Sequence, residues 1–98
     1  MKVLWTEAAI GQLQTIHDFI AQTSPEYALR IVDRLTNRSI QIALFPQSGP
    51  TVPEYELDEV RQIVEGSYRI IYLIQKAEDG IEVLAVVHTA RERLDLMG

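Results

Sequence analysis

Four arginines and one histidine in the second half of the chain could act together on a phosphate group. They are Arg61, Arg69, His88, Arg91 and Arg93. Arginine binds phosphate oxygens through paired N–H groups, and histidine gains or loses a proton near neutral pH. Metal-free RNA cleavage requires such groups, because a base must deprotonate the 2′-hydroxyl while cations stabilise the transition-state charge. The pattern therefore suggests a nuclease hypothesis with Arg61, Arg69, His88 and Arg91 as candidate catalytic residues.

The same residues also allow a purely structural interpretation. His88 follows the apolar run Val83–Val87 and can simply mark the end of a strand. An acidic segment, Glu54 to Glu59, precedes the first of these arginines, which can neutralise it. Charge networks of this kind also occur in proteins without any catalytic role for them. The residues alone leave both interpretations open.

The composition limits the kinds of function that the chain can have. Its 98 residues suit one small domain, which we expect to span residues 1–98. No cysteine is present, and neither His17 nor His88 has a second histidine or a carboxylate at metal-ligand spacing. A net charge of −5 is unfavourable for general nucleic-acid binding, which requires many phosphate-neutralising cations. We therefore expect no metal and no other cofactor.

Membrane and export signals are also not expected. The longest apolar runs, Ile70–Ile74 and Val83–Val87, are far shorter than the roughly 18 residues that span a membrane. The N-terminus becomes charged too early for a signal peptide. The sequence therefore predicts a cytoplasmic protein that makes no membrane contact.

Two helices are expected after a short strand at residues 2–5. Thr6 is a suitable N-cap for the first helix, and Ser24 and Pro25 predict the cap and first residue of the second. The second helix should end near Phe45, because the next residue is a proline. The apolar faces are expected to contain Ala9, Leu13, Ile16 and Ile20 in the first helix and Ala28, Ile31, Val32, Leu35 and Ile42 in the second. The short break between the helices predicts an antiparallel hairpin.

Three strands are predicted at residues 60–64, 68–75 and 81–88. The third is apolar on both sides and should be central in the sheet. Turns join the strands, and Gly80 is expected to take the left-handed conformation. Because successive antiparallel strands meet end to start, Arg69 and His88 should be neighbours. The fold class is therefore α+β, a two-layer domain in which the helix hairpin covers one face of an antiparallel meander and leaves the other partly open.

A stripe of arginines is expected on the second helix. Arg30, Arg34 and Arg38 are spaced four residues apart, which places them on one face. We interpret this stripe as a solvated surface of the helix, because exposed charge runs usually have no other role.

Several short motifs are distributed along the second half of the chain. Phe45-Pro46-x-Ser48-Gly49 and Val52-Pro53-Glu54 are followed by Val60-Arg61, by Gly66-x-Tyr68-Arg69-Ile70-Ile71-Tyr72 and by Val83-Leu84-x-Val86-Val87-His88-x-Ala90-Arg91. With the preceding strand and helix hairpin, this series resembles the ParE branch of the RelE/ParE toxin superfamily over nearly the whole chain. The resemblance implies the toxin of a type II toxin–antitoxin pair, which a small antitoxin wraps. It also implies that the toxin would contact operator DNA only through this antitoxin. ParE members inhibit DNA gyrase, whereas RelE members cleave mRNA in the ribosome.

The branch of the superfamily decides whether the protein is an enzyme. RelE-type nucleases resemble this chain at Arg61 and Arg69, but they have lysines in the middle loops and a tyrosine or histidine in the tail. Here the middle loop is acidic, and Thr89-Ala90-Arg91 follows His88. This favours a gyrase inhibitor without catalytic residues, with the ribosome-dependent endoribonuclease as the alternative. Pro50 and Leu73 stand where arginine is common in the ParE pattern, so a non-toxic antitoxin-binding module is a third hypothesis.

Two binding surfaces are expected from these considerations. The residues expected to bind the target are Arg61, Tyr68, Arg69, His88, Arg91 and Arg93. The tail from Thr89 to Leu96 is expected to contribute to this contact. Apolar helix residues that stay exposed without a partner are expected to receive the antitoxin, and these are Leu13, Ile16, Ile20, Ile31 and Leu35.

Overall fold

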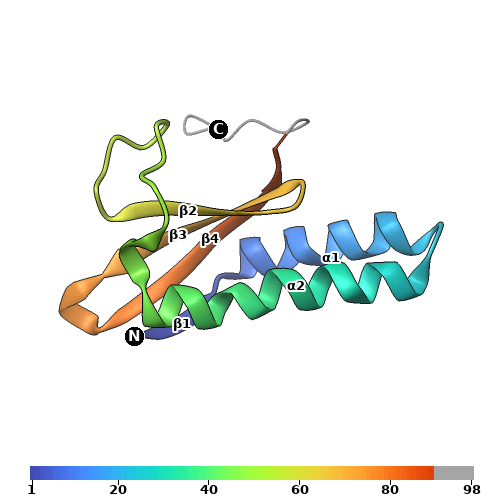
Figure 1. Ribbon diagram of the computed structural model, residues 1–98, viewed down its shortest axis with the longest axis horizontal. Coiled ribbons are helices and arrows are strands. Elements are labelled where there is room, and N and C mark those ends of the chain that lie inside the picture. The colour runs from blue at the N-terminus through green and yellow to red at the C-terminus, as the bar shows by residue number, and fades with distance from the viewer. Residues whose placement is uncertain (90–98) are drawn as a thin grey trace.

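The computed structural model of the protein describes residues 1–89 as a sheet with a helix hairpin on one side (Figure 1). The elements along the chain are β1 (Lys2–Trp5), α1 (Glu7–Ala21), α2 (Pro25–Leu44), η1 (Pro46–Ser48), β2 (Val60–Glu65), β3 (Tyr68–Gln75), η2 (Lys76–Glu78) and β4 (Gly80–His88), where η marks a short 3-10 helix. This order confirms the expected strand, helix hairpin and meander. Arg91 and Arg93, and the tail beyond Thr89, lie outside the described residues.

Both long helices begin at the predicted caps. The Thr6 side chain accepts a hydrogen bond from the Ala9 amide at 3.2 Å, and the Ser24 side chain accepts one from the Tyr27 amide at 3.2 Å. Pro25 occupies the first turn of α2, and Phe45 leaves the helical conformation directly before Pro46. Among residues 1–89, no helix combines the length and the apolarity that a membrane crossing requires.

The strands form one mixed sheet in the order β1-β4-β3-β2. β2, β3 and β4 are antiparallel neighbours, and β1 lies parallel to β4 with Lys2 opposite Gly80. β4 is therefore paired on both sides, which confirms the central position predicted from its apolar composition. The N-terminal strand extends the sheet beyond β4, where Lys2–Trp5 pair with the first residues of β4, Gly80–Val83.

Each turn of the meander contains one residue with positive φ. Gly66 has a φ of +59° in the hairpin between β2 and β3, where glycine is favoured. In the turn before β4, Asp79 has a φ of +50°. The expectation that Gly80 takes this conformation is wrong, because Gly80 already belongs to β4 and pairs with Gln75. Aspartate tolerates the left-handed region better than most residues that have a side chain.

Each face of the sheet has its own buried cluster. The larger cluster faces α1 and α2 and includes Leu35, Ile42, Ile63, Ile70 and Tyr72. The smaller cluster, on the opposite face, contains Val60, Ile71, Ala85 and Val87 and is completed by Val52 and Tyr55. The last two belong to the loop between η1 and β2, which lies on the far side of the sheet from the helices (Figure 1). The loop thus covers part of this face, while Leu4 and Val64 on the same face are 60% and 54% exposed, so the face is partly open as expected.

The residues expected to receive an antitoxin are directed toward the core instead. Leu35 is fully buried and Ile31 is nearly so, while Leu13, Ile16 and Ile20 are partly buried and pack against the same cluster. The expectation that Ile31 and Leu35 remain exposed is therefore wrong. Their periodicity reflects packing of the hairpin on the sheet, which the sequence pattern alone does not distinguish from a binding face.

Candidate functional site

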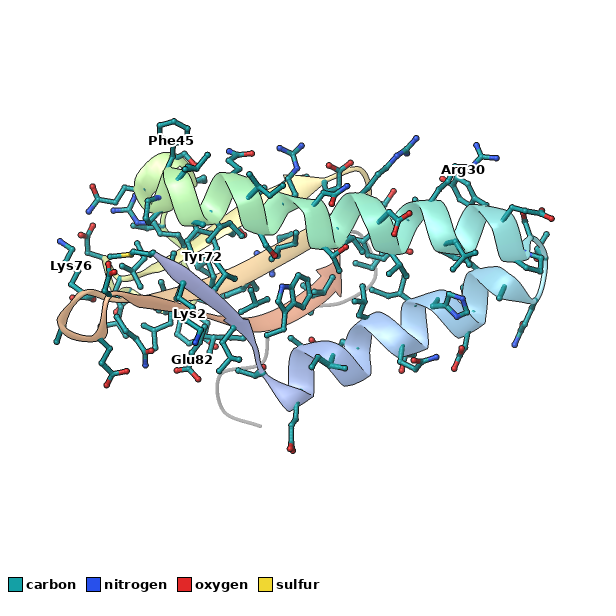
Figure 2. All side chains as sticks on the ribbon, turned by 90° about the horizontal axis from the view of Figure 1, so that it is seen from below. Lys2, Arg30, Phe45, Tyr72, Lys76 and Glu82 are labelled. Carbon is teal, nitrogen blue, oxygen red and sulfur yellow. The ribbon has the colours of Figure 1, made fainter. Side chains whose placement is uncertain are left out.

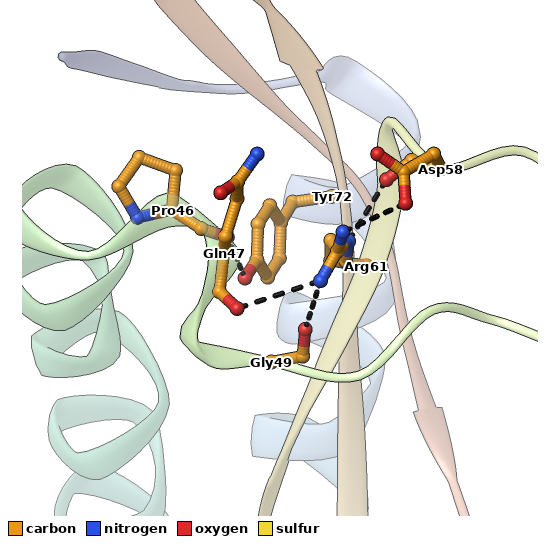
Figure 3. Close-up of polar contacts among 6 residues, drawn as sticks. All are labelled: Pro46, Gln47, Gly49, Asp58, Arg61 and Tyr72. Carbon is orange, nitrogen blue, oxygen red and sulfur yellow. Dashed lines mark hydrogen bonds and ion pairs between the residues drawn. The ribbon is translucent and has the colours of Figure 1, made fainter.

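Arg61 is a structural anchor in the described part of the chain. Its Nε donates to the Asp58 carbonyl oxygen at 2.8 Å, and its Nη2 contacts the Asp58 carboxylate at 2.9 Å. Its Nη1 donates to the carbonyl oxygens of Gly49 at 3.1 Å and Gln47 at 3.4 Å (Figure 3). The side chain is only 14% exposed. These contacts leave the guanidinium little freedom to bind a phosphate or a protein target.

Tyr72 of β3 holds the segment 46–49, which Arg61 also contacts. Its ring is fully buried, and its hydroxyl donates to the Pro46 carbonyl oxygen (Figure 3). Burial raises the pKa of the Tyr72 phenol above 10.0, and the Gly49 backbone hydrogen bond and the Arg61 charge oppose this only in part. An added Cβ at Gly49 would stand 2.2 Å from the Gln62 carbonyl oxygen, so only glycine fits there. The Phe45-Pro46-x-Ser48-Gly49 motif therefore has a structural reason.

Arg69 anchors the acidic loop to the outer face of the sheet. Its Nη2 contacts the Glu54 carboxylate at 3.0 Å, and its Nη1 donates to the Gln62 side-chain oxygen at 2.9 Å. The Arg69 side chain is 16% exposed. Together with the Arg61 pair, this is the arrangement that the structural interpretation predicts, in which arginines neutralise the acidic segment.

His88 lies on the helix-facing side of the sheet, opposite Arg69. It pairs with Tyr68 across β3 and β4, and the two rings meet edge to face with centroids 5.3 Å apart. Arg69 is instead paired with Val87, whose side chain belongs to the cluster on the outer face. Neighbouring residues of a strand point to opposite faces, so the expected proximity of Arg69 and His88 is one of backbone only. Within residues 1–89, these groups do not form one site.

The three arginines of the α2 stripe lie in different environments. Arg38 pairs with Glu65 of β2 at 2.8 Å and donates to the Gln41 side chain at 2.6 Å, whereas Arg30 and Arg34 are exposed. Of these three arginines, Arg30 and Arg34 are therefore the ones open to a partner.

Among the described residues, no three histidine, cysteine or acidic side chains gather to hold a metal ion.

An exposed apolar surface at the end of α2 was not anticipated from the sequence. Ile40, Leu44 and Phe45 have exposed fractions of 64%, 66% and 63%. Two grooves, of about 660 and 560 Å³, meet at Leu44 and Phe45. The available signal was that Ile40 and Leu44 fall outside the inward face that contains Leu35. Large apolar side chains grouped on a surface indicate an interaction site.

The fold and its comparisons define the class of protein. The structure is similar to that of the chromosomal ParDE toxin–antitoxin system from P. aeruginosa, with a TM-score of 0.73, 21% identity and coverage of 90% of this chain and 95% of that one. It is also similar to the toxin–antitoxin complex RelBE2 from Mycobacterium tuberculosis, with a TM-score of 0.65, 21% identity and coverage of 89% and 95%. The architecture is thus that of the RelE/ParE-type toxins.

The sequence comparisons identify the family within this class. The family model described as ParE toxin of type II toxin-antitoxin system, parDE, matches residues 3–93. The chain therefore belongs to the ParE toxin family. It is also similar to Toxin RelE2 from Caulobacter vibrioides, with 31% identity over 90 residues that cover 92% of this chain and 97% of the relative. The resemblance inferred from the motifs is confirmed.

Proposed function

We propose that this toxin acts by binding to DNA gyrase, and that a cognate antitoxin protein neutralises it. Membership of the ParE family and the likeness to solved toxin–antitoxin systems support the antitoxin as a partner. Contact with operator DNA would run through the antitoxin, because a net charge of −5 disfavours direct binding. The proposal implies that the protein acts in the cytoplasm, where the gyrase is.

The placement of Arg61 and Arg69 carries the proposal. A nuclease needs cations that converge on the scissile phosphate and a proton-transfer group within hydrogen-bond reach. Arg61 and Arg69 are instead engaged with Asp58 and Glu54, and Arg69 lies on the sheet face opposite His88. A toxin that acts by protein binding does not require these groups to converge.

We assign different roles to the residues expected to bind the target. Arg61 and Arg69 contribute by holding the η1–β2 loop, while Tyr68 and His88 fix the end of the sheet from which the chain continues. Arg91 and Arg93, outside the described residues, are proposed to contact gyrase directly.

A supercoiling assay with purified gyrase tests the proposal. The wild-type protein is expected to inhibit supercoiling of relaxed plasmid, and Arg91→Ala is expected to abolish both this inhibition and toxicity in cells without antitoxin. Arg30→Ala is the matched control, because Arg30 is an exposed arginine that is not among the residues expected to bind the target. It lies at the far end of α2 from η1 (Figure 2). A folded Arg91→Ala variant with full inhibition and full toxicity would contradict the assigned role.

A ribosome-dependent endoribonuclease is the second candidate. It is favoured by the likeness to a relative that bears the name Toxin RelE2. In this case supercoiling is unaffected and ribosome-bound mRNA is cut, with Arg61, Arg69, His88 and Arg91 as the polar groups to test. If the protein affects neither gyrase nor mRNA and is harmless in cells, it is a binding module without toxicity.

A further inference from the structure

The two grooves at the end of α2 form one continuous surface, here called the α2–η1 surface. Its lining includes Arg34, Arg38, Ile40, Leu44, Phe45, Pro46, Ile74 and Lys76. Figure 2 shows Phe45 directed away from the sheet, with Lys76 at the same end of the molecule and Arg30 at the other. The surface therefore has an apolar centre at Leu44 and Phe45 between two cationic ends.

The charge of the α2–η1 surface is opposite to that of the whole chain. Among the described residues that line the two grooves, the cationic side chains are those of Arg34, Arg38 and Lys76, and Glu65 supplies the carboxylate. Met1 also lines the first groove, and its N-terminal ammonium donates to the Ala43 carbonyl oxygen at 3.1 Å. Glu65 is already paired with Arg38, so the side-chain charges open to a partner are those of Arg34 and Lys76. The chain as a whole has a net charge of −5. A local reversal of charge next to exposed apolar side chains favours a partner that is both apolar and acidic.

We propose that the α2–η1 surface binds an apolar, acidic segment of the antitoxin. Apolar side chains of the segment would cover Leu44 and Phe45 and occupy the groove toward Pro46 and Ile74, while its carboxylates would meet Arg34 and Lys76. The inference rests on the proposed function in taking the partner to be the antitoxin. It does not depend on whether gyrase is the target.

Two other occupants fit the surface less well. Nucleic acid is attracted by dense cationic charge, whereas the centre of this surface is apolar and its two open cations lie at its ends. A second copy that docked by the same surface would bring cationic groups toward each other. A second copy that docked by its acidic loop would use Leu57, which is exposed between acidic neighbours. This last arrangement is an outcome of the test below.

The probe is a displayed library of random 16-residue peptides, selected for binding to the full-length protein. We expect the enriched peptides to combine apolar residues with a negative net charge. Fluorescence anisotropy with synthetic copies then measures the affinity for four variants. Leu44→Ser and Arg34→Glu should each weaken binding by about tenfold or more, because both change the proposed contact.

Two matched variants separate this surface from general effects on the protein. Leu29→Ser alters a leucine of α2 that is 59% exposed, against 66% for Leu44, and Arg30→Glu reverses an arginine of the same stripe, but neither residue lines the grooves. Both should bind the peptides like the wild type, and circular dichroism should show all four variants folded. These positions are all exposed, so loss of the fold is not expected.

Several results would overturn the proposal. They are the absence of enriched peptides, the enrichment of basic or uncharged ones, and affinities that Leu44→Ser and Arg34→Glu leave unchanged. Sedimentation of the wild-type protein without peptide is expected to show a monomer. A dimer that Leu44→Ser dissociates would instead assign the surface to a second copy. A failed gyrase assay together with the expected peptide results would reject the target and leave the surface proposal intact.

Discussion

Two groups of cations in this toxin are in opposite situations. Arg61 and Arg69, on the sheet, are mostly buried and bound to carboxylates and oxygens of the η1–β2 loop. Arg34 and Lys76, on the α2–η1 surface, are exposed beside apolar side chains. The arginines that most resemble catalytic groups in the sequence thus stabilise the fold, whereas less conspicuous cations are available to a partner. Environment, more than residue type, separates the two roles.

Gly49→Ala should have the largest effect and tests how tightly the sheet side is fixed. The new methyl group would meet the Gln62 carbonyl oxygen, so we expect a loss of about 3 kcal/mol in the free energy of unfolding. Urea unfolding followed by circular dichroism measures it. Gly11→Ala is the control, because Gly11 lies in α1 with open space around it and should gain about 0.5–1 kcal/mol. Equal stability of the two variants would contradict the fixed position of η1.

Arg61→Ala and Arg34→Ala compare the two groups of cations directly. Loss of Arg61 leaves the Gly49 and Gln47 carbonyl oxygens without this donor and should lower the free energy of unfolding by about 2 kcal/mol. Loss of Arg34 should change it by less than about 0.5 kcal/mol. Peptide binding should show the reverse order, with the larger loss for Arg34→Ala. If both substitutions change stability equally, the contrast between the two groups fails.

Tyr72→Phe tests the buried hydrogen bond beneath η1 and its dependence on pH. At neutral pH the loss of the bond to Pro46 should cost about 1–2 kcal/mol. Because the pKa of Tyr72 is raised in the folded protein, its contribution is complete below pH 10.0 and is lost as the pH rises further. Urea midpoints of wild type and Tyr72→Phe should therefore converge above pH 10.0. The exposed Tyr27→Phe should keep the wild-type profile, and a constant difference between wild type and Tyr72→Phe would reject this assignment.

The Arg38–Glu65 pair should show the smallest effect and is intermediate between the two groups. Its side chains are 37% and 22% exposed, which permits screening by solvent. A double-mutant cycle of Arg38→Met and Glu65→Gln should give a coupling of about 0.5 kcal/mol in unfolding experiments. A coupling above about 2 kcal/mol would show that this edge of the α2–η1 surface is as firmly fixed as the sheet side.

Local signals predicted most of the elements. The caps at Thr6 and Ser24, the end of α2 before Pro46 and the central position of β4 depend on chemistry within a few residues. The parallel pairing of β1 with β4 joins distant parts of the chain, and no local pattern contains it. The turn before β4 was predicted, but its left-handed residue is Asp79 and not Gly80, because the register of β4 places Gly80 inside the strand.

The candidate site was harder to predict than the fold. The sequence contains Arg61, Arg69 and His88, but it does not show which face of the sheet each side chain occupies. It also does not show that the η1–β2 loop folds over the outer face and brings Glu54 to Arg69. Helical periodicity likewise marked Ile31 and Leu35 as an apolar face without showing that the sheet covers them. Only tertiary packing separates that face from the exposed Leu44 and Phe45.

The most direct test of the central claim is primer extension on mRNA from translating ribosomes to which the purified protein has been added. The claim is that the sheet arginines support the fold and that the toxin acts by binding. We predict full-length mRNA at protein concentrations that inhibit gyrase supercoiling. Cuts in ribosome-bound mRNA that a folded Arg69→Gln variant no longer makes would contradict the account.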